Sequence, residues 1–190
     1  QGVVSQISSQ NKNILAAPIT FEAGSGATNI VFTDSVWTYS TVSDAKVVAQ
    51  KTLSSAQLDL QIRETIEYDG MIRVDVTMIP TGALIDRLVL KVPVNSANAK
   101  YLNWTRSLSG GNRDHWGFGA LPGAGFKGNW RPFLSLGDED RGLLWFSEGM
   151  QNWNLSANGI SNALQVVKSG TTTELRVTMM DRAKTNRGTN

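Results

Sequence analysis

Apolar and polar residues alternate with a period of two along most of the chain, which is typical of strands with one buried face. In LDLQIRETIEY (58–68), leucine or isoleucine occupies every second position at first. A second alternating run follows the Asp-Gly pair at 69–70. An Asp-Gly pair between two such runs is a strong hairpin signal, so this pattern predicts two antiparallel strands.

The register of this hairpin follows from its two faces. A two-residue loop would place Ile66 opposite an arginine and mix apolar with polar positions. A three-residue loop with Gly70 in the left-handed region places Ile66 opposite Ile72. It also places Arg63 opposite Asp75, a pair worth about 0.2–1 kcal/mol. We therefore predict the three-residue loop.

Other segments repeat the pattern, and none of ten or more residues keeps a helical stripe. Strands are predicted over residues 28–40, 45–53, 84–92, 131–136, 142–148, 163–168 and 173–180. About ten strands separated by Gly, Asn, Asp and Ser predict an all-β fold, an antiparallel β-sandwich. Trp37 and Trp145 lie within apolar strand patterns and are expected in its core. With no repeat or linker visible, residues 1–190 are expected to form a single domain.

One long segment breaks the alternation. Between Trp104 and Trp130 the chain is rich in glycine, tryptophan and basic residues and has no strand pattern. Irregular connections of this length inside a compact domain are usually functional. We predict a long irregular Gly/Trp-rich loop here.

Composition and charge exclude several function classes. The 190 residues contain no cysteine, which excludes disulfide frameworks, thiol nucleophiles and zinc ribbons. The net charge is +2 and the basic residues are scattered, so no nucleic-acid footprint stands out. No apolar run reaches the roughly 18 residues of a membrane helix. The start at Gln1 and the polar end are interpreted as those of a mature form or an excised domain.

The acidic run DEDRGLLWFSE (138–148) has three readings. The run lies between two predicted strands and is flanked by glycines, which favours a solvated turn. A pair of catalytic carboxylates, as in glycoside hydrolysis, needs a separation of roughly 5–9 Å, which adjacent acids meet trivially. A calcium site is the third reading, since clustered carboxylates suit this ion. We expect the turn, no cofactor, and at most a structural calcium.

Several motifs together resemble one family. NKNILAAPITFEA, IRETIEYDGMIRVDVTM, KVPVNSANAKYLNW, GALPG and WRPFLSLGDEDRGLLWFSEGMQNW occur in that order, before a closing LRV strand. They resemble the N-terminal β-sandwich domain of multidomain bacterial proteins related to family 123 glycoside hydrolases, the β-N-acetylgalactosaminidases. The family's usual GLxWFAESDxGW is kept at Trp145, Phe146, Glu148 and Trp153. Gly149-Met150 and Asn152 depart from it, so no role of the acidic residue after Glu148 carries over.

The resemblance implies a non-catalytic accessory domain. Such sandwiches precede a TIM-barrel catalytic domain, and a barrel needs about 250 residues, so no catalytic residue can be carried over. A sandwich of this kind suggests a carbohydrate-binding module, secreted, periplasmic or at the cell surface, that binds polysaccharide with a preference for anionic or sulfated glycans. Its partners would be the polysaccharide and the catalytic domain, with no nucleic acid and no membrane.

Exposed indoles can stack on sugar rings and arginines can pair with acidic groups. The candidate substrate-binding residues are Trp104, Arg106, Arg113, His115, Trp116, Trp130, Arg131 and Trp153. The same indoles could instead plug the open end of the sandwich. Two alternatives remain open: a structural domain that packs on a TIM-barrel glycoside hydrolase and binds no glycan alone, and a small polysaccharide lyase or hydrolase. The second needs several of Glu148, His115, Arg113 and Tyr101 to converge in one groove.

Overall fold

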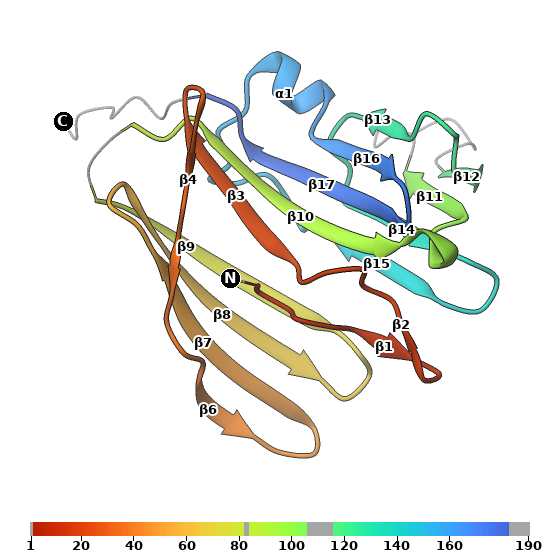
Figure 1. Cartoon of the computed structure of the whole chain (residues 1–190), viewed down its shortest axis with the longest axis horizontal. Helices are drawn as coiled ribbons and strands as arrows, with labels where there is room; N and C mark the ends of the chain where they lie inside the picture. Colours follow the sequence, from red (N-terminus) through yellow and green to blue (C-terminus); the bar gives the residue numbers. More distant parts are fainter. Residues whose placement is uncertain (1, 82–83, 106–115, 183–190) are drawn as a thin grey trace. The chain divides into compact units, whose positions relative to one another are not determined.

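The structure is a computed structural model that describes residues 2–81, 84–105 and 116–182. Strands make up nearly all of its regular structure, with one short α-helix and one 3-10 turn among the described residues (Figure 1). The named strands pair in antiparallel fashion within several sheets. The all-β prediction is therefore confirmed.

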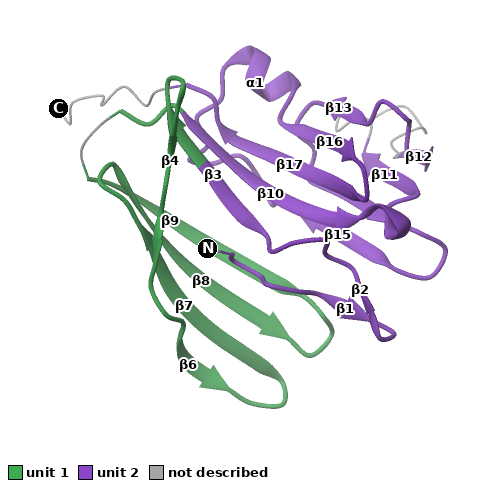
Figure 2. Ribbon diagram, in the orientation of Figure 1, with its two compact units in different colours: residues 1, 23–86, 184–190 green, residues 2–22, 87–183 purple. Residues whose placement is uncertain are grey.

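The described chain divides into two compact units (Figure 2). Within the described ranges, unit 1 comprises residues 23–86, and unit 2 comprises residues 2–22 together with 87–182. Unit 2 is thus built from two stretches of chain that flank unit 1 in the sequence. Strand β3 (Thr20–Ser25) runs through the first junction, so no linker marks it. That the whole chain is one domain stays a prediction.

Unit 1 is built on one antiparallel sheet of five strands. Three of them, β7, β8 and β9, neighbour each other in the sheet in chain order, and β5 and β6 pair with β7. The short strand β4 (Thr28–Ile30) pairs with the last residues of β3. The sheet strands are β5 (Thr33–Asp34), β6 (Thr38–Val42), β7 (Lys46–Ser54), β8 (Leu58–Glu67) and β9 (Ile72–Pro80).

The predicted register of the β8–β9 hairpin is confirmed. Ile66 lies opposite Ile72, and the glycine of the three-residue loop has a left-handed φ of 92°. Arg63 lies opposite Asp75, as expected. The Asp75 carboxylate, however, pairs at 3.0 Å with Arg73, two residues away on its own strand. The apolar face of the hairpin determines its register. The exposed Asp75 carboxylate nevertheless pairs with Arg73 on its own strand rather than with Arg63 across the hairpin.

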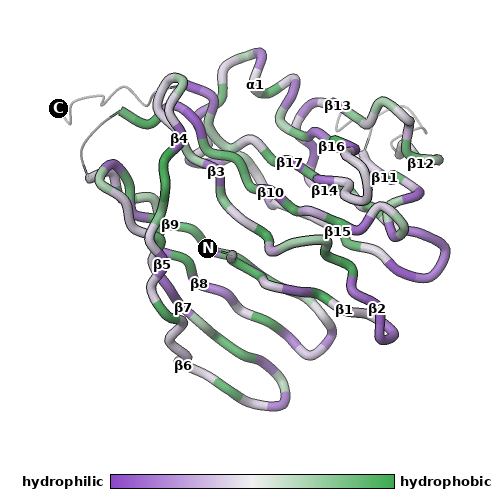
Figure 3. Tube along the Cα trace, viewed as in Figure 1, coloured by the Kyte–Doolittle hydropathy of each residue, from purple (hydrophilic) through white to green (hydrophobic). Residues whose placement is uncertain are grey.

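The same sheet carries two charged residues in buried positions. Figure 3 shows apolar and polar residues succeeding each other along β8, and Glu64 interrupts the apolar face at only 4% exposure. Lys51 of β7, opposite Ile62, is also buried. Its ammonium lies 3.3 Å from the Asp34 carboxylate and 4.8 Å from the ring centroid of Trp37. Trp37, expected in the core, is half-buried.

Unit 2 is a sandwich of two antiparallel sheets. The larger has the order β13-β16-β17-β10-β3, and the smaller has the order β12-β11-β14-β15. Their strands, besides β3, are β10 (Arg87–Asn95), β11 (Tyr101–Thr105), β12 (Trp116–Ala120), β13 (Phe126–Gly128), β14 (Phe133–Gly137), β15 (Gly142–Phe146), β16 (Leu164–Ser169) and β17 (Thr172–Met180). The other elements of this unit are β1 (Ser8–Ser9), β2 (Lys12–Asn13), the 3-10 turn η1 (Ser96–Asn98) and helix α1 (Ala157–Ser161).

The core of unit 2 draws on both of its sheets. Val92 and Val166 of the larger sheet and Leu102 and Leu134 of the smaller sheet belong to one buried apolar cluster. Trp145 is half-buried and packs against this cluster, in line with its expected core position. Burial of alternate residues from two facing sheets defines the sandwich.

The strands are more numerous and shorter than the alternation suggests. The described residues contain seventeen strands, where about ten were predicted. The segment between Trp104 and Trp130 is also less irregular than expected, because it contains β12 and β13. These strands contain Gly117, Gly119 and Gly128. Because glycine has no side chain that marks a buried or an exposed face, the strands do not show the alternation of apolar and polar residues.

The β1–β2 hairpin turns through two left-handed residues, Gln10 (φ 51°) and Asn11 (φ 59°). Asparagine tolerates this region, whereas other side chains lose roughly 1–2 kcal/mol there. We expect Gln10→Asn to raise the free energy of unfolding by about 0.5–1 kcal/mol in urea titrations. The control Ser9→Asn, outside the turn, should give no gain. A less stable Gln10→Asn chain would contradict the strain argument.

Candidate functional site

The acidic run forms a turn, as expected. It connects β14 to β15, whose end residues Gly137 and Gly142 lie opposite each other. Asp138 caps the turn by accepting hydrogen bonds from the backbone N–H groups of Asp140 and Arg141, both at 2.8 Å. These two bonds lower the pKa of the Asp138 carboxyl, because they stabilise its ionised form. The carboxylate thus has a structural task.

Glu139, at the tip of this turn, is held by two side chains. Its carboxylate accepts hydrogen bonds from the Lys100 ammonium at 2.7 Å and from the Tyr101 hydroxyl at 2.9 Å. The bond from Lys100 contributes most to lowering the pKa of Glu139 to about 2. A carboxyl with such a pKa stays ionised at neutral pH and is poorly suited to act as a general acid.

Trp104 and Trp153 of the predicted site pack against the core cluster of unit 2. The Trp104 ring lies 5.0 Å from the Phe126 ring, tilted by 51°. It also covers Gly117 on the neighbouring strand, where a Cβ would overlap the indole. The side chains of Trp104 and Trp153 are half-buried. Their contacts are those of packing residues rather than of an exposed platform.

Trp130 and Arg131 are also half-buried. The Trp130 indole N–H is buried without a hydrogen-bond partner among the described residues. Arg131 donates a hydrogen bond of 3.2 Å to the backbone carbonyl of Trp130. The backbone of Trp130 is fixed in turn by a 3.0 Å bond from its N–H to the carbonyl of Ile160.

The remaining predicted residues cannot be placed with these. Arg106, Arg113 and His115 lie outside the described residues, and of Trp116 only the backbone, opposite Thr105 in β12, is described. The predicted glycan site in this segment stays a prediction.

A group of four aromatic residues and one leucine lies on the outer face of the smaller sheet, and we call this surface the aromatic face. Register places its members on one side: Asn103 lies opposite Phe118 and Ser135, and Ser135 lies opposite Leu144. Phe118 is 74% exposed and Leu144 is 62% exposed, although both belong to strands. The aromatic face consists of Tyr101, Phe118, Phe133, Leu144 and Phe146.

Two members of the aromatic face form a stacked pair. The rings of Tyr101 and Phe118 have centroids 6.2 Å apart and planes inclined by 21°. Lys100 and Glu139 lie at the edge of this pair through their bonds to each other and to Tyr101. The sequence signal for this face is the alternation of GLLWF, in which Leu144 and Phe146 occupy the side opposite the core-packing residues Leu143 and Trp145.

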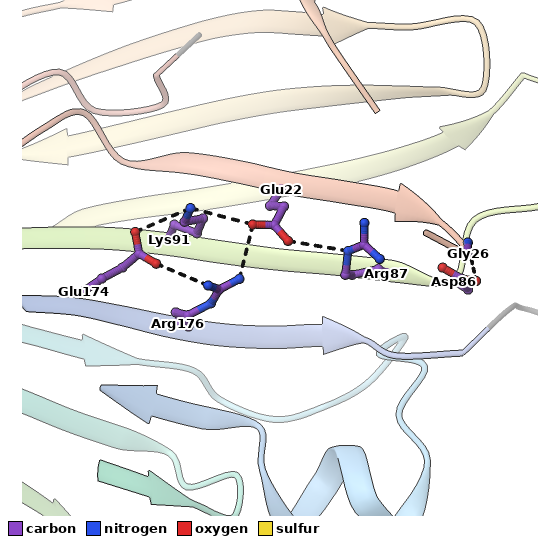
Figure 4. A network of polar contacts seen from close by, with 7 residues as sticks. All are labelled: Glu22, Gly26, Asp86, Arg87, Lys91, Glu174 and Arg176. Atoms are coloured by element: carbon purple, nitrogen blue, oxygen red, sulfur yellow. Dashed lines mark hydrogen bonds and ion pairs between the residues drawn. The ribbon is translucent and has the colours of Figure 1, made fainter. Parts of the chain in front are cut away.

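The larger sheet of unit 2 carries a ladder of ion pairs, drawn in Figure 4. Glu22 pairs with Arg87 at 3.5 Å, with Lys91 at 3.6 Å and with Arg176 at 3.2 Å. Glu174 pairs with Lys91 at 3.5 Å and with Arg176 at 3.6 Å. Because each of these cations already has a carboxylate partner, the ladder is a structural network and a weak candidate for binding acidic sugars.

The described part of the chain contains neither a candidate metal site nor a candidate membrane-spanning helix. Residues 2–81, 84–105 and 116–182 contain no group of three or more His, Asp or Glu side chains that could hold a metal ion. The structural calcium considered from the sequence has no candidate cluster there. No described helix is long and apolar enough to span a membrane.

Comparison with known proteins identifies a family. The model of glycoside hydrolase 123, third domain, matches residues 1–131, while no curated protein matches the chain. The matching family is that of the third domain, whereas the resemblance implied an N-terminal domain. The match ends before β14 to β17. Of these strands, β14 pairs with β11 and with β15 in the smaller sheet, and β17 pairs with β10 and with β16 in the larger sheet, so they complete both sheets of unit 2. Since the match covers more than half of the residues, the chain belongs to the family of glycoside hydrolase 123 third domains.

Proposed function

We propose that this domain is a non-catalytic accessory domain of a glycoside hydrolase and that it binds polysaccharide on the aromatic face. It would act where polysaccharide is found, secreted, in the periplasm or at the cell surface. The family membership supports the link to a glycoside hydrolase. The observation that carries the binding proposal is the stacked ring pair of the half-buried Tyr101 and the exposed Phe118, in a sheet face bordered by polar groups.

The chemistry of sugars suits this surface. One face of a sugar ring presents C–H groups, which pack on exposed aromatic rings, and the rim presents hydroxyls. Phe118 offers a largely open ring, and Lys100 and Glu139 add a donor and an acceptor beside the hydroxyl of its stacking partner Tyr101. A flat strand face also accommodates a polymer that extends past both ends of the site. Neither a metal ion nor a cofactor is needed for such contacts.

Absence of catalysis is part of the proposal. Asp138 is engaged by the turn, Glu139 stays ionised, and Glu148 is exposed beyond the end of β15. The pKa values of Asp138 and Glu139 are both lowered, so neither supplies the general acid with a raised pKa that glycoside hydrolysis uses. The lyase or hydrolase alternative would gain support from new reducing ends or unsaturated products after incubation with a polysaccharide panel.

A second candidate function is supported by one specific observation. Leu144 and Phe146, exposed at 62% and 48%, lie on the edge strand β15 of the smaller sheet. An aliphatic side chain such as Leu144 suits contact with another protein surface better than contact with a sugar. The domain would then serve as a structural part that packs against the catalytic domain and binds no glycan alone.

Affinity electrophoresis of the chain through gels that contain neutral or sulfated polysaccharides tests the proposal. We expect retardation in at least one gel, and Phe118→Ala should weaken it about tenfold, because one stacking contact is worth roughly 1–2 kcal/mol. Tyr68→Ala removes an aromatic ring that is 85% exposed in unit 1 and is the matched control. It should leave the retardation unchanged.

The outcomes separate the candidates. Retardation that survives Phe118→Ala contradicts binding on the aromatic face. No retardation in any gel favours the structural function. Retardation only in the sulfated gels would support the anionic preference, which depends on Arg106, Arg113 and His115 outside the described residues. Chelation with EDTA should change none of these results.

A further inference from the structure

A second surface of unit 2 is an open groove lined by amide side chains. Its volume is ≈ 580 Å³, within the range of about 300–1,000 Å³ usual for small-molecule sites. Three pieces of chain form its walls: the β1–β2 hairpin, the turn after β10 and the turn between β16 and β17. The lining residues that matter here are Asn11, Lys12, Asn13, Asn95, Asn98 and Thr171.

Hydrogen bonds hold these walls together. The Asn95 and Asn98 amides each donate to the backbone carbonyl of Asn13 at 2.9 Å, which joins the hairpin to the turn after β10. The backbone N–H of Ser96 donates to the carbonyl of Thr171 at 2.9 Å, which joins that turn to the β16–β17 turn. Hydrogen bonds therefore join the turn after β10 to the hairpin on one side of the groove and to the β16–β17 turn on the other.

The same bonds decide which polar atoms are left for a ligand. Because Asn95 and Asn98 use their amide nitrogens within the protein, their amide oxygens remain acceptors without a partner in the described chain. The side chains of Asn11, Lys12 and Thr171 make no hydrogen bond within the described residues. The lining thus offers both donors and acceptors, and Lys12 carries its one formal charge.

This pattern narrows the ligand class. A metal ion would need carboxylates, and the lining contains none. An acidic ligand would need several cations, and Lys12 is the one cation of the lining. Ala97 is its one apolar side chain, but carbon atoms of the polar side chains and the backbone make up most of the lining surface, which suits the C–H groups of a sugar ring. A neutral saccharide matches, because its hydroxyls can donate to the amide oxygens of Asn95 and Asn98 and can accept from donors such as the Lys12 ammonium. We propose that this groove binds a neutral mono- or disaccharide.

The inference is independent of binding on the aromatic face, because the two surfaces share no residue. The test is a titration of the ¹⁵N-labelled full chain with galactose and with N-acetylgalactosamine, followed by NMR. We expect saturable shifts of the side-chain amide signals of Asn95 and Asn98, with millimolar affinity. Glucuronate is the charged comparison and should bind no better than the neutral sugars.

Asn11→Gly is the variant of choice because its φ of 59° is one that glycine adopts freely. Losing one amide contact should weaken binding about threefold to tenfold. Asn152→Gly is the matched control, since Asn152 is exposed, has a φ of 70° and does not line the groove. It should bind as the parent does.

The inference is overturned if no groove signal shifts with either neutral sugar, if glucuronate binds more tightly than both, or if the two glycine variants bind alike. Its failure can be told apart from failure of the proposed function. Loss of gel retardation in Phe118→Ala with groove shifts intact concerns the aromatic face alone. Groove signals that stay unmoved while the gel assay succeeds concern this inference alone.

Discussion

Replacing Glu64 by glutamine is expected to stabilise the chain by about 3 kcal/mol more at pH 8 than at pH 4. Burial raises the pKa of Glu64 to about 7 from an ordinary 4.5, and the nearby Lys51 only partly opposes this. One oxygen of this carboxyl, Oε1, is buried without a hydrogen-bond partner in the described chain. The folded protein therefore favours the neutral acid, which glutamine imitates at every pH.

The direction of the pH dependence follows from proton binding. Between pH 4.5 and about 7 the folded chain keeps a proton on Glu64 that the unfolded chain has released. The free energy of unfolding of the parent must fall as pH rises through this window. Below the window both states are protonated, and the parent and Glu64→Gln chains should be nearly equal in stability.

Urea unfolding of the parent and the variant at several pH values between 4 and 8 measures this difference. Asp59→Asn is the control, because Asp59 lies on the same strand at a half-buried position of the opposite face. It should change the pH profile by less than about 0.5 kcal/mol. Parallel profiles for the parent and Glu64→Gln would show that the buried carboxyl is charged in the folded state after all.

Trp104→Ala is expected to lower the free energy of unfolding by about 3 kcal/mol. The indole packs against the core cluster of unit 2 and against Phe126, so its removal leaves a cavity at the edge of the core. An exposed, sugar-stacking tryptophan would instead cost little, as surface changes usually stay within about 0.5 kcal/mol. The measurement therefore distinguishes the packing role from the platform role.

Two further variants serve as controls for the stability effect of Trp104→Ala. Tyr68→Ala deletes an aromatic side chain that is 85% exposed and should be nearly neutral for stability. Gly117→Ala should destabilise in the same way as Trp104→Ala, because its new methyl group would displace the indole that covers this glycine. If Trp104→Ala unfolds at the same urea concentration as the parent, Trp104 returns as a candidate for glycan contact.

Trp104 and Trp153 pack against the core cluster, whereas Phe118 and Phe146 are exposed on the aromatic face. Their exposed counterparts on the aromatic face are shorter side chains that register alone brings together from several strands. Phe118 and Leu144 are far apart in the sequence, and no motif links them. Trp104 and Trp153 are half-buried against the core cluster, because large aromatic side chains gain most from burial, and their contact with a glycan stays a prediction.

The period-two pattern was sufficient by itself for the fold class, for most long strands and for the register of the β8–β9 hairpin. A one-residue slip would turn the whole apolar face of β8 toward water, so local pattern and pairing must agree. The acidic turn was likewise readable, since the Asp138 cap depends on neighbours two and three residues away. The family motifs were also present in the sequence and implied a glycoside hydrolase domain.

Tertiary structure alone decided the rest. Glu64 occupies an inward position of an alternating strand, but only the folded chain shows that it is buried with an unpaired oxygen. The division into two units, the aromatic face and the amide-lined groove each join residues that are distant in sequence. Alternation tells which side of a strand is apolar, whereas exposure depends on what packs against that side, and packing is a property of the whole fold.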